Sequence, residues 1–473
     1  MPSLLVGETG KMTQKTMIHN FTEGNIPKQM LRFTGPFILA NILQTAYNIV
    51  DMIVIGQFVG ANGLSAVSIG GQITTLVTFV GIGFATTGQV MISQYVGKNN
   101  RPAISRTVGT MLTLIQALSL VLTVAGILLI DPIIRWLNTP LEAVAQTRDY
   151  MLVCFLGMFF IFGYNAVSSI LRGMGDSRRP LVFIAIASLM NLVLDLYFVA
   201  VLHWAAFGTA LATVMGQAVS FIVAIIYLYR RRESFGFDFR LSSFRPSKDI
   251  VYPMLKMGIP MTLQSIAISL SMTIVGAFVN AYGVVAAAVG GVGQKLGMIS
   301  GIITQSIAAA STTMIGQNLA GRKIDRVNRI VGIALLINMS FAVLVSLAMI
   351  FFCKEIFSIF NREPEVLEMG RLYILPFVLG TLAMASMSPF NALINGLGYA
   401  SLAFGIAILD GVVARLGLAL LFGRVLGMGV QGFWLGRQLA GFVTTLIAGG
   451  YYLSGRWKTR QLLIREEEPS AET

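Results

Sequence analysis

The chain alternates long apolar stretches with short polar connectors. Each stretch is near the roughly 20 residues that a helix needs to cross the hydrocarbon core of a bilayer. Gly, Pro and Asn gather at the joints, as in Gly60-Ala61-Asn62-Gly63, and these residues favour turns. The pattern therefore predicts an all-α integral membrane protein with twelve transmembrane helices. Their expected bounds are 32–58, 64–93, 103–130, 148–171, 181–202, 205–229, 253–280, 286–316, 328–353, 371–394, 400–422 and 429–453.

The composition agrees with this pattern. Hydrophobic residues make up 55% of the 473 positions and charged residues 12%, with a mean hydropathy of +0.76. A soluble domain has about 25% charged residues, so this chain cannot cover a globule of that size with polar groups. The net charge of +13 could indicate nucleic-acid binding. The basic residues lie in the connectors, however, so we expect no nucleic-acid partner.

The distribution of Lys and Arg predicts the orientation. With the N-terminus inside, 25 of the 34 basic residues lie in inside segments and 6 in outside connectors. The remaining three, Lys295, Arg415 and Arg437, fall within spans. Inside loops are typically rich in Lys and Arg, so both termini are predicted to be cytoplasmic.

The two halves of the chain repeat. Pro36 and Pro260 are 224 residues apart (260 − 36), and each follows a similar Met-Leu-Arg/Lys motif. Gln94 and Gln317 are 223 apart (317 − 94). Two six-helix lobes of the same topology, with a central cleft between them, are therefore predicted. We expect an N-terminal segment 1–30, an N-lobe 31–230, a linker 231–250, a C-lobe 251–455 and a charged, solvated tail 456–473.

Three acidic residues lie deep in predicted spans: Asp51, Asp195 and Asp410. Each costs roughly 2.5–3.5 kcal/mol at a helix centre, and such residues usually face a bundle interior or a wet cavity. Tyr47 precedes Asp51 by four residues, and Asn191 precedes Asp195 by four, so each pair shares a helix face.

Two carboxylates in one low-dielectric cavity repel each other and are poorly solvated, which favours proton uptake. Carboxylate, amide and hydroxyl oxygens are also hard ligands that suit Na⁺. Asp51, Asp195 and Asn191 would be metal ligands only in the Na⁺ case, and the sequence leaves H⁺ and Na⁺ open. The alternative is that these polar residues only brace helix packing.

Three other charged residues and two prolines in the spans are further candidates. Asp410 and Arg415 are five apart and could form a structural ion pair or face a substrate cleft. Lys295 could be a counter-charge in the cleft, or it could snorkel toward the interface. Pro36 and Pro260 interrupt the first span of each half, and each could be a hinge or an ordinary kink.

Several functions are not indicated. The chain lacks a P-loop, a dinucleotide fingerprint and a metalloprotease motif. Its two cysteines and two histidines indicate neither a disulfide framework nor a metal site. We expect neither enzyme activity nor a cofactor, so transport would draw on an ion gradient.

The residues resemble those of the multidrug and toxic compound extrusion (MATE) transporters over nearly the whole chain. The order and spacing of the motifs carry the resemblance. They are Pro36, Tyr47 and Asp51 on the first span, Gln94-Tyr95-Val96-Gly97 after the second, Arg172-Gly173-Met174-Gly175-Asp176 after the fourth, and Gly208-Thr209-Ala210-Leu211-Ala212-Thr213 with Gly216-Gln217 on the sixth.

Within this family the chain is similar to the DinF-like branch, in which paired aspartates lie in the N-lobe. The resemblance implies that Asp51 and Asp195 couple transport to a cation, and that Tyr47, Asn191 and Thr213 complete their cluster. It implies a monomer in a bacterial or archaeal plasma membrane that exports small amphipathic, often cationic compounds in exchange for H⁺ or Na⁺. A lipid or lipid-linked oligosaccharide flippase of the same superfamily is the main alternative, and a channel or membrane scaffold is a third.

Overall fold

The computed structural model describes residues 18–464, which form helices and connecting turns without a β-strand. The first lobe contains α1 (Ile26–Phe58), α2 (Ala61–Gly97), α3 (Arg101–Trp136), α4 (Leu141–Leu156), α5 (Met158–Gly173), α6 (Arg178–Asp195) with the π-helix η1 (Leu196–Val201), and α7 (Ala205–Arg230). The second lobe contains α9 (Lys248–Asn280), α10 (Val284–Ala320), α11 (Ile324–Phe351), α14 (Ile374–Leu397), α15 (Ala400–Ile408), η4 (Leu409–Ala414), α16 (Arg415–Leu420), η5 (Leu421–Val425) and α17 (Gly429–Leu453).

Shorter helices complete the connectors: α8 (Arg232–Phe235), η2 (Leu241–Phe244), α12 (Cys353–Ser358), α13 (Pro364–Gly370), η3 (Arg371–Tyr373) and η6 (Arg456–Thr459). Ten helices in residues 18–464 are long and apolar enough to span a membrane, and the bent pair α4–α5 adds an eleventh. The 25-residue α17, which packs along α14, completes the twelve helices of the two-lobed fold. The charged stretch Arg465–Glu468 lies outside the described residues.

The helix starts follow from local chemistry. The Asn25 side chain accepts a hydrogen bond from the Lys28 amide at 3.0 Å, and Asn100 accepts one from the Ala103 amide at 3.0 Å. Each bond satisfies an amide that the first helical turn leaves without a partner. The fourth predicted span differs most from expectation. It begins seven residues earlier, at Leu141, and bends by 47° at Gly157, a residue type that weakens a helix interior.

Backbone geometry repeats along with the sequence. Gly60, between α1 and α2, has φ +82°, and Gly283, at the equivalent turn of the second lobe, has φ +99°. These positive values are readily adopted only without a side chain. Asn99 and Arg322, which follow α2 and α10, have φ +54° and +57°. The equivalent turns thus have the same handedness in both lobes.

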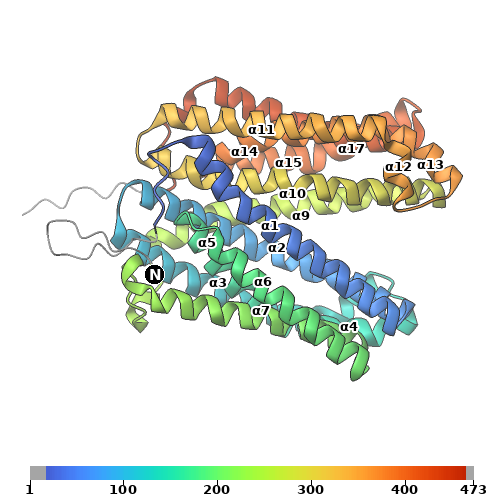
Figure 1. The fold of residues 1–473 in the computed structure, drawn as a ribbon, viewed down its shortest axis with the longest axis horizontal. Helices are drawn as coiled ribbons and strands as arrows, with labels where there is room; N and C mark the ends of the chain where they lie inside the picture. The colour runs from blue at the N-terminus through green and yellow to red at the C-terminus, as the bar shows by residue number, and fades with distance from the viewer. Residues whose placement is uncertain (1–17, 465–473) are drawn as a thin grey trace, which may run out of the picture.

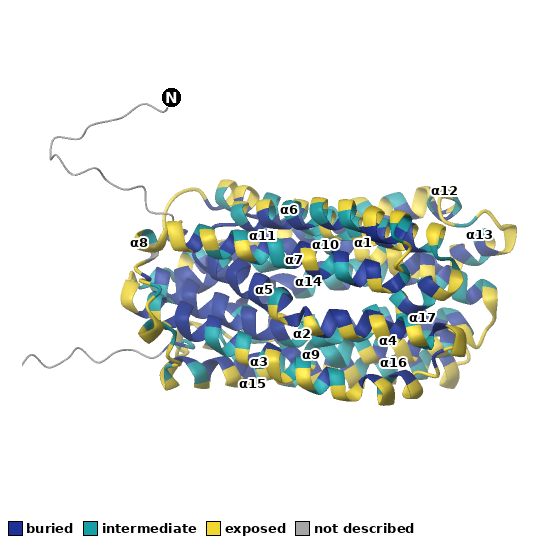
Figure 2. Ribbon diagram, turned by 90° about the horizontal axis from the view of Figure 1, so that it is seen from below, coloured by how far each residue is buried: buried dark blue, intermediate teal, exposed yellow. Residues whose placement is uncertain are grey.

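The lobes meet at one end of the molecule, where residues 18–25 and 456–464 also lie; we name it the terminal end and the opposite one the far end (Figure 1). Residues 87–94 of α2 and 310–320 of α10 are entirely buried, whereas most of residues 61–80 and 294–299 are partly or fully exposed. Figure 2 shows the buried residues gathered at the terminal end. The cleft between the lobes is therefore closed at the terminal end and opens toward the far end.

Polar side chains hold the closed end together. Gln89 Nε2 donates to Thr313 Oγ1 at 2.9 Å, and Gln94 Nε2 donates to the Gly396 carbonyl at 2.7 Å, both between lobes. A Cβ atom at Gly97 would overlap the Gln317 backbone, so glycine permits this close approach. The two terminal segments, residues 18–25 and 456–464, also bind at this contact between the lobes.

The same pair of glutamines binds both segments. Gln317 Oε1 accepts from the Phe21 amide at 2.8 Å, and Gln94 Oε1 accepts from the Ile464 amide at 3.3 Å. These two glutamines are equivalent in the repeat, and each uses its amide group to join separate parts of the chain. We call Gln89, Gln94, Thr313 and Gln317 the terminal gate.

Candidate functional site

Asp51 and Asp195 meet inside the N-lobe, in the half nearer the far end. α1 packs against α6 and η1, which brings the first and fifth predicted spans together. Asp51 is 7% exposed and Asp195 is fully buried. The two carboxyl groups are neighbours in the interior of the lobe. The structure therefore joins residues that are 144 positions apart (195 − 51) in the sequence.

The other residues expected in this cluster also lie here. Asn191 Nδ2 donates to Thr213 Oγ1 at 3.3 Å, which links α6 to α7. Both side chains lie in the neighbourhood of the Asp51 carboxyl group. Tyr47 lies one turn before Asp51 on α1 and is its neighbour in space. We call Tyr47, Asp51, Asn191, Asp195 and Thr213 the acidic cluster.

The acidic cluster has more buried acceptors than donors. Asp51 Oδ1, both carboxylate oxygens of Asp195 and Asn191 Oδ1 are buried without a hydrogen-bond donor. Ionised carboxylates only accept hydrogen bonds, so two of them cannot satisfy each other. Buried polar atoms in native proteins are nearly always paired, and an exception calls for an unseen partner such as a water or an ion. The arrangement fits a proton or a small cation among these oxygens.

Two more residues belong to this neighbourhood. Tyr150 of α4 is buried close to Asp51. Thr209 lies one turn from Thr213 on α7, and Asp195 lies one turn from Asn191 on the antiparallel α6. The bond between Asn191 and Thr213 therefore places Thr209 level with Asp195.

The Thr209 hydroxyl is itself buried without a partner. One feature of the sequence could have identified Thr209, namely its four-residue spacing from Thr213. No sequence signal pointed to Tyr150, because its approach depends on how α4 packs.

The chemistry of the acidic cluster is that of hard oxygen ligands. Within residues 18–464 no group of three or more His, Cys, Asp or Glu side chains could hold a metal ion. Carboxylate, amide and hydroxyl oxygens suit a proton or an alkali cation better than a soft metal. Asp195 is also the last residue of α6 before the π-helix η1, and such local changes of helical pitch are frequent at functional sites.

The remaining charged candidates have different surroundings. Arg415 Nη2 lies 3.2 and 3.3 Å from the two carboxylate oxygens of Asp410, and both residues are buried in the C-lobe. Lys295 is exposed on α10, with Nζ 5.8 Å from the centre of the Phe360 ring. The structure does not bring Lys295 to Asp410 or to the acidic cluster.

Both candidate hinge prolines lie inside continuous helices. Pro36 is in α1 and Pro260 is in α9. Next to Pro36, the Phe37 ring has the Arg172 guanidinium 4.8 Å from its centre. Near Pro260, Gly258 and Thr262 pack against Phe84 and Gly83 of α2. Each proline is therefore close to a packing contact that a bend of its helix would alter.

Residues 18–464 form twelve helices in two equivalent lobes, with a cleft closed at one end and polar residues buried inside the N-lobe. This arrangement defines a polytopic membrane transporter. The sequence matches the MatE family twice, over residues 36–197 and 260–421. The second match begins 224 residues after the first (260 − 36), which is the interval of the internal repeat. The chain belongs to the MatE family, whose members are transporters and not enzymes.

Individual relatives agree with this assignment. The chain is 28% identical to the probable multidrug resistance protein YpnP of Bacillus subtilis, over 95% of this chain and 99% of that protein. It is 26% identical to the probable multidrug resistance protein YoeA of the same organism, over 92% and 95% of the two chains. A multidrug resistance MATE family transporter solved in an outward-facing conformation has the same fold, with a TM-score of 0.87, 21% identity and coverage of 95% and 100%.

Proposed function

We propose that this protein is a secondary active multidrug efflux transporter. It would export small amphipathic, often cationic compounds in exchange for H⁺ or Na⁺ bound at the acidic cluster. We place it in a bacterial or archaeal plasma membrane as a monomer with both termini cytoplasmic, so that the terminal gate faces the cytoplasm. The names of the relatives support drug export, and the distribution of Lys and Arg supports the orientation.

The observation that carries the ion coupling is the set of donor-less oxygens around Asp51 and Asp195. Two unit charges 4 Å apart interact by about 4 kcal/mol at the effective dielectric constant of 20 typical of proteins. An added proton or cation removes this repulsion and satisfies the oxygens. Occupancy of the cluster therefore changes the free energy of the N-lobe, as an ion-driven mechanism requires.

A route from the acidic cluster to the gate runs along α1. Asp51 lies in its far half, whereas Asn41 Nδ2 donates to Ser306 Oγ of the C-lobe at 3.1 Å. Phe33 and Phe37, nearer the terminal end, pack in a core shared with α10 and α11. A shift of α1 upon ion binding would thus disturb contacts between the lobes, and Pro36 lies where such a bend would occur. A ligand changes a conformation only through its different affinity for the two states.

In the C-lobe, Pro260 would act as the equivalent hinge in α9. Lys295 is a candidate charge on the substrate path, since it is exposed on a helix that contacts the other lobe. Asp410 and Arg415 neutralise each other, so neither offers a net charge to a substrate in this conformation.

Transport in proteoliposomes tests the proposal. The purified protein would be reconstituted and loaded with a fluorescent organic cation, with Na⁺ and pH gradients imposed separately. We expect saturable efflux driven by one of the two gradients, and loss of that dependence in Asp51→Asn. Asp131→Asn is the control, because Asp131 is an exposed acid on α3 paired with Arg148 at 3.3 Å. Efflux that persists in the double variant Asp51→Asn/Asp195→Asn, with its gradient dependence intact, would exclude the acidic cluster as the coupling site.

A further inference from the structure

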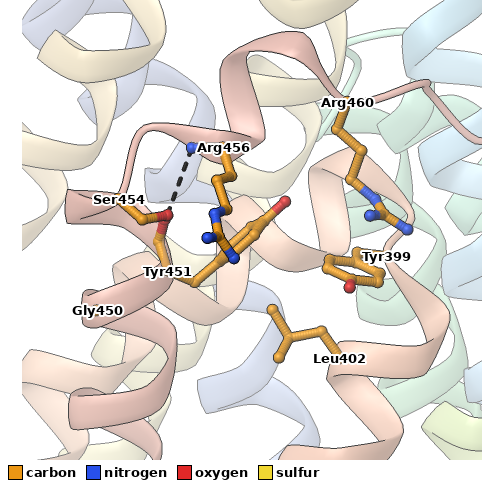
Figure 3. A pocket seen from close by; sticks show the side chains of 7 residues that line it. All are labelled: Tyr399, Leu402, Gly450, Tyr451, Ser454, Arg456 and Arg460. Atoms are coloured by element: carbon orange, nitrogen blue, oxygen red, sulfur yellow. Dashed lines mark hydrogen bonds between the residues drawn. The ribbon is translucent and has the colours of Figure 1, made fainter.

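A cavity of about 450 Å³ opens at the terminal end of the C-lobe, between the start of α15 and the end of α17 (Figure 3). It is remote from the acidic cluster, which lies in the other lobe toward the far end. Its volume is in the range of small-molecule sites. The cavity is lined by Tyr399, Leu402, Gly450, Tyr451, Ser454, Arg456 and Arg460.

Two guanidinium groups supply positive charge to this cavity. Arg456 and Arg460 are both exposed, and within residues 18–464 neither forms an ion pair with a carboxylate. The Arg460 guanidinium lies over the Tyr399 ring, 3.2 Å from its centre, and Tyr451 lines the same cavity. In Figure 3 both arginines descend from the segment after α17 toward the two tyrosines. The cavity is a basic site whose charge is not neutralised by the described residues.

The segment that carries the arginines is anchored. Trp457 lies between them in sequence and is 1% exposed, and its Nε1 donates to the Tyr452 carbonyl at 3.0 Å. The Ser454 hydroxyl accepts from the Arg456 amide at 3.4 Å. A fixed backbone lowers the entropy cost of holding two long side chains near one ligand.

The first turn of α15 adds to the positive potential. The helix begins at Ala400, directly after Tyr399, and its start has no side-chain cap. The amide groups of an uncapped helix start favour an anion, and phosphate is a common one. Two arginines and two residues of this helix start, Tyr399 and Leu402, therefore line the same cavity.

The cavity continues into an apolar surface. On α17, Leu446, Gly450 and Leu453 follow one another at spacings of four and three residues and so share a face. Leu446 is 75% exposed and Leu453 is 83% exposed. Tyrosines beside such a surface are typical of the membrane–water interface. A ligand that fits this arrangement has an anionic head and an apolar chain.

We propose that this cavity binds the phosphate-bearing headgroup of an anionic phospholipid, whose acyl chain lies along the exposed face of α17. Arg456 and Arg460 hold the phosphate, and Tyr399 and Tyr451 form the walls at the headgroup level. Basic pockets between transmembrane helices are known to take such headgroups. A soluble phosphate compound has the same anionic group but no acyl chain that could contact the apolar face of α17.

The test measures lipid binding to the full-length protein. The protein would be purified in a neutral detergent and titrated with phosphatidylglycerol or phosphatidylcholine, with the bound lipid counted by native mass spectrometry. We expect one phosphatidylglycerol to bind with clear preference over phosphatidylcholine. Each of Arg456→Gln and Arg460→Gln should weaken it about fivefold, since one basic residue near a membrane surface contributes a factor of this size, and the double variant should show no preference.

Two further variants make the result specific. Lys458→Gln removes the same charge from the same turn, but Lys458 does not line the cavity; its affinity should stay within about twofold of the unaltered protein. Gly450→Leu fills the cavity instead of changing its charge, and a Cβ atom at Gly450 meets open space, so the helix tolerates it. Gly450→Leu should abolish the preference for phosphatidylglycerol while the melting temperature is maintained. An equal loss in Lys458→Gln, or no loss in Gly450→Leu, would reject a defined site.

Two competitors identify the source of the anion. Inorganic phosphate at millimolar concentration should not displace phosphatidylglycerol, and displacement would reassign the cavity to a soluble anion. The chain's own acidic stretch Glu466-Glu467-Glu468 is the second competitor. Lipid binding that appears only after all three are changed to Gln would assign the cavity to this tail and overturn the proposal.

Discussion

The two lobes each bury acidic residues in the membrane region, but they treat the charge differently. In the N-lobe, Asp51 and Asp195 are neighbours, and among residues 18–464 no basic side chain forms an ion pair with either. In the C-lobe, Asp410 has its counter-ion, Arg415, at 3.2 Å. The same fold thus contains an acidic pair that lacks a cation and an ion pair that is complete. We infer that the acidic pair of the N-lobe is the functional one, because its carboxylate oxygens lack the partner that an exchanging ion would supply.

The difference between the lobes predicts that breaking the ion pair between Asp410 and Arg415 destabilises the protein most. Arg415→Met leaves Asp410 buried without its partner, and such a change costs about 3–5 kcal/mol. We expect a strongly lowered melting temperature in detergent, measured by a thiol-reactive dye or by loss of the monodisperse peak after heating. Removing both charges, in Asp410→Leu/Arg415→Met, should restore most of the stability, since a well-packed apolar pair is often as stable as a buried ion pair.

The corresponding substitution in the acidic pair of the N-lobe should change the melting temperature in the opposite direction. Asp195→Asn removes a buried charge that has no cationic partner, so the melting temperature should stay or rise. If Asp195→Asn destabilises the protein as much as Arg415→Met does, the two sets are alike and both are structural.

The second prediction concerns the affinity of the acidic cluster for its ion. An interaction with a charged group contributes about 1.5–3 kcal/mol, so Asp195→Asn should weaken cation binding by roughly 10- to 100-fold. The measurement is the concentration of Na⁺ or H⁺ that half-saturates efflux, or isothermal titration with Na⁺ at constant pH. Asp410→Asn is the matched control in the other lobe. It should lower stability but leave the half-saturating ion concentration unchanged in the protein that remains folded.

The sequence predicts different amounts about the acidic cluster and about the ion pair of the C-lobe. The twelve spans, the two lobes and the three buried acids followed from hydrophobic length, the repeat interval and the cost of charge in a membrane. The meeting of Asp51 with Asp195 did not, because it depends on how α1 crosses α6. The resemblance to known transporters suggested it, and in the structure the packing of α1 against α6 makes the two residues neighbours.

The ion pair of the C-lobe shows why spacing alone was insufficient. Residues five apart do not share a face of an α-helix, which has 3.6 residues per turn. Asp410 lies in the π-helix η4 (Leu409–Ala414), in which residues five apart are bonded neighbours. The altered pitch therefore places Arg415 over Asp410. This pitch has no clear sequence signature. Gly157 permits the bend between α4 and α5 but does not predict it, because glycines such as Gly70 also lie inside unbroken helices.

The third prediction contrasts the two ends of the cleft. Gln94→Ala and Gln317→Ala each remove hydrogen bonds that close the terminal end, and one such bond contributes about 0.5–1.5 kcal/mol. We expect a larger fraction of molecules with the terminal end open. Spin labels on Arg101→Cys and Asp325→Cys, equivalent exposed positions in the two lobes, would report it as a longer distance in pulsed EPR.

Selective labelling and a control variant make the EPR distance specific to the terminal end. The native Cys154 and Cys353 are both buried, so labelling should be selective. Gln431→Ala is the control, because Gln431 Nε2 donates to the Leu372 carbonyl within the C-lobe at 3.3 Å, away from the gate. An unchanged distance distribution in Gln94→Ala/Gln317→Ala would mean that apolar packing, and not the glutamines, closes the terminal end.

The smallest expected effect tests whether the Thr209 hydroxyl is a ligand of the bound cation or only lies near it. Thr209 lies level with Asp195, and its hydroxyl is buried without a partner. Thr209→Val keeps the shape and removes the oxygen, so it should weaken cation binding by about fivefold, equivalent to one hydrogen bond of roughly 1 kcal/mol. Thr209→Ser retains the oxygen and should bind as the unaltered protein does. Because valine and threonine fill nearly the same volume, equal half-saturating concentrations in all three proteins would show that the Thr209 oxygen does not contact the ion. The acidic cluster would then end at Thr213, whose hydroxyl accepts from Asn191.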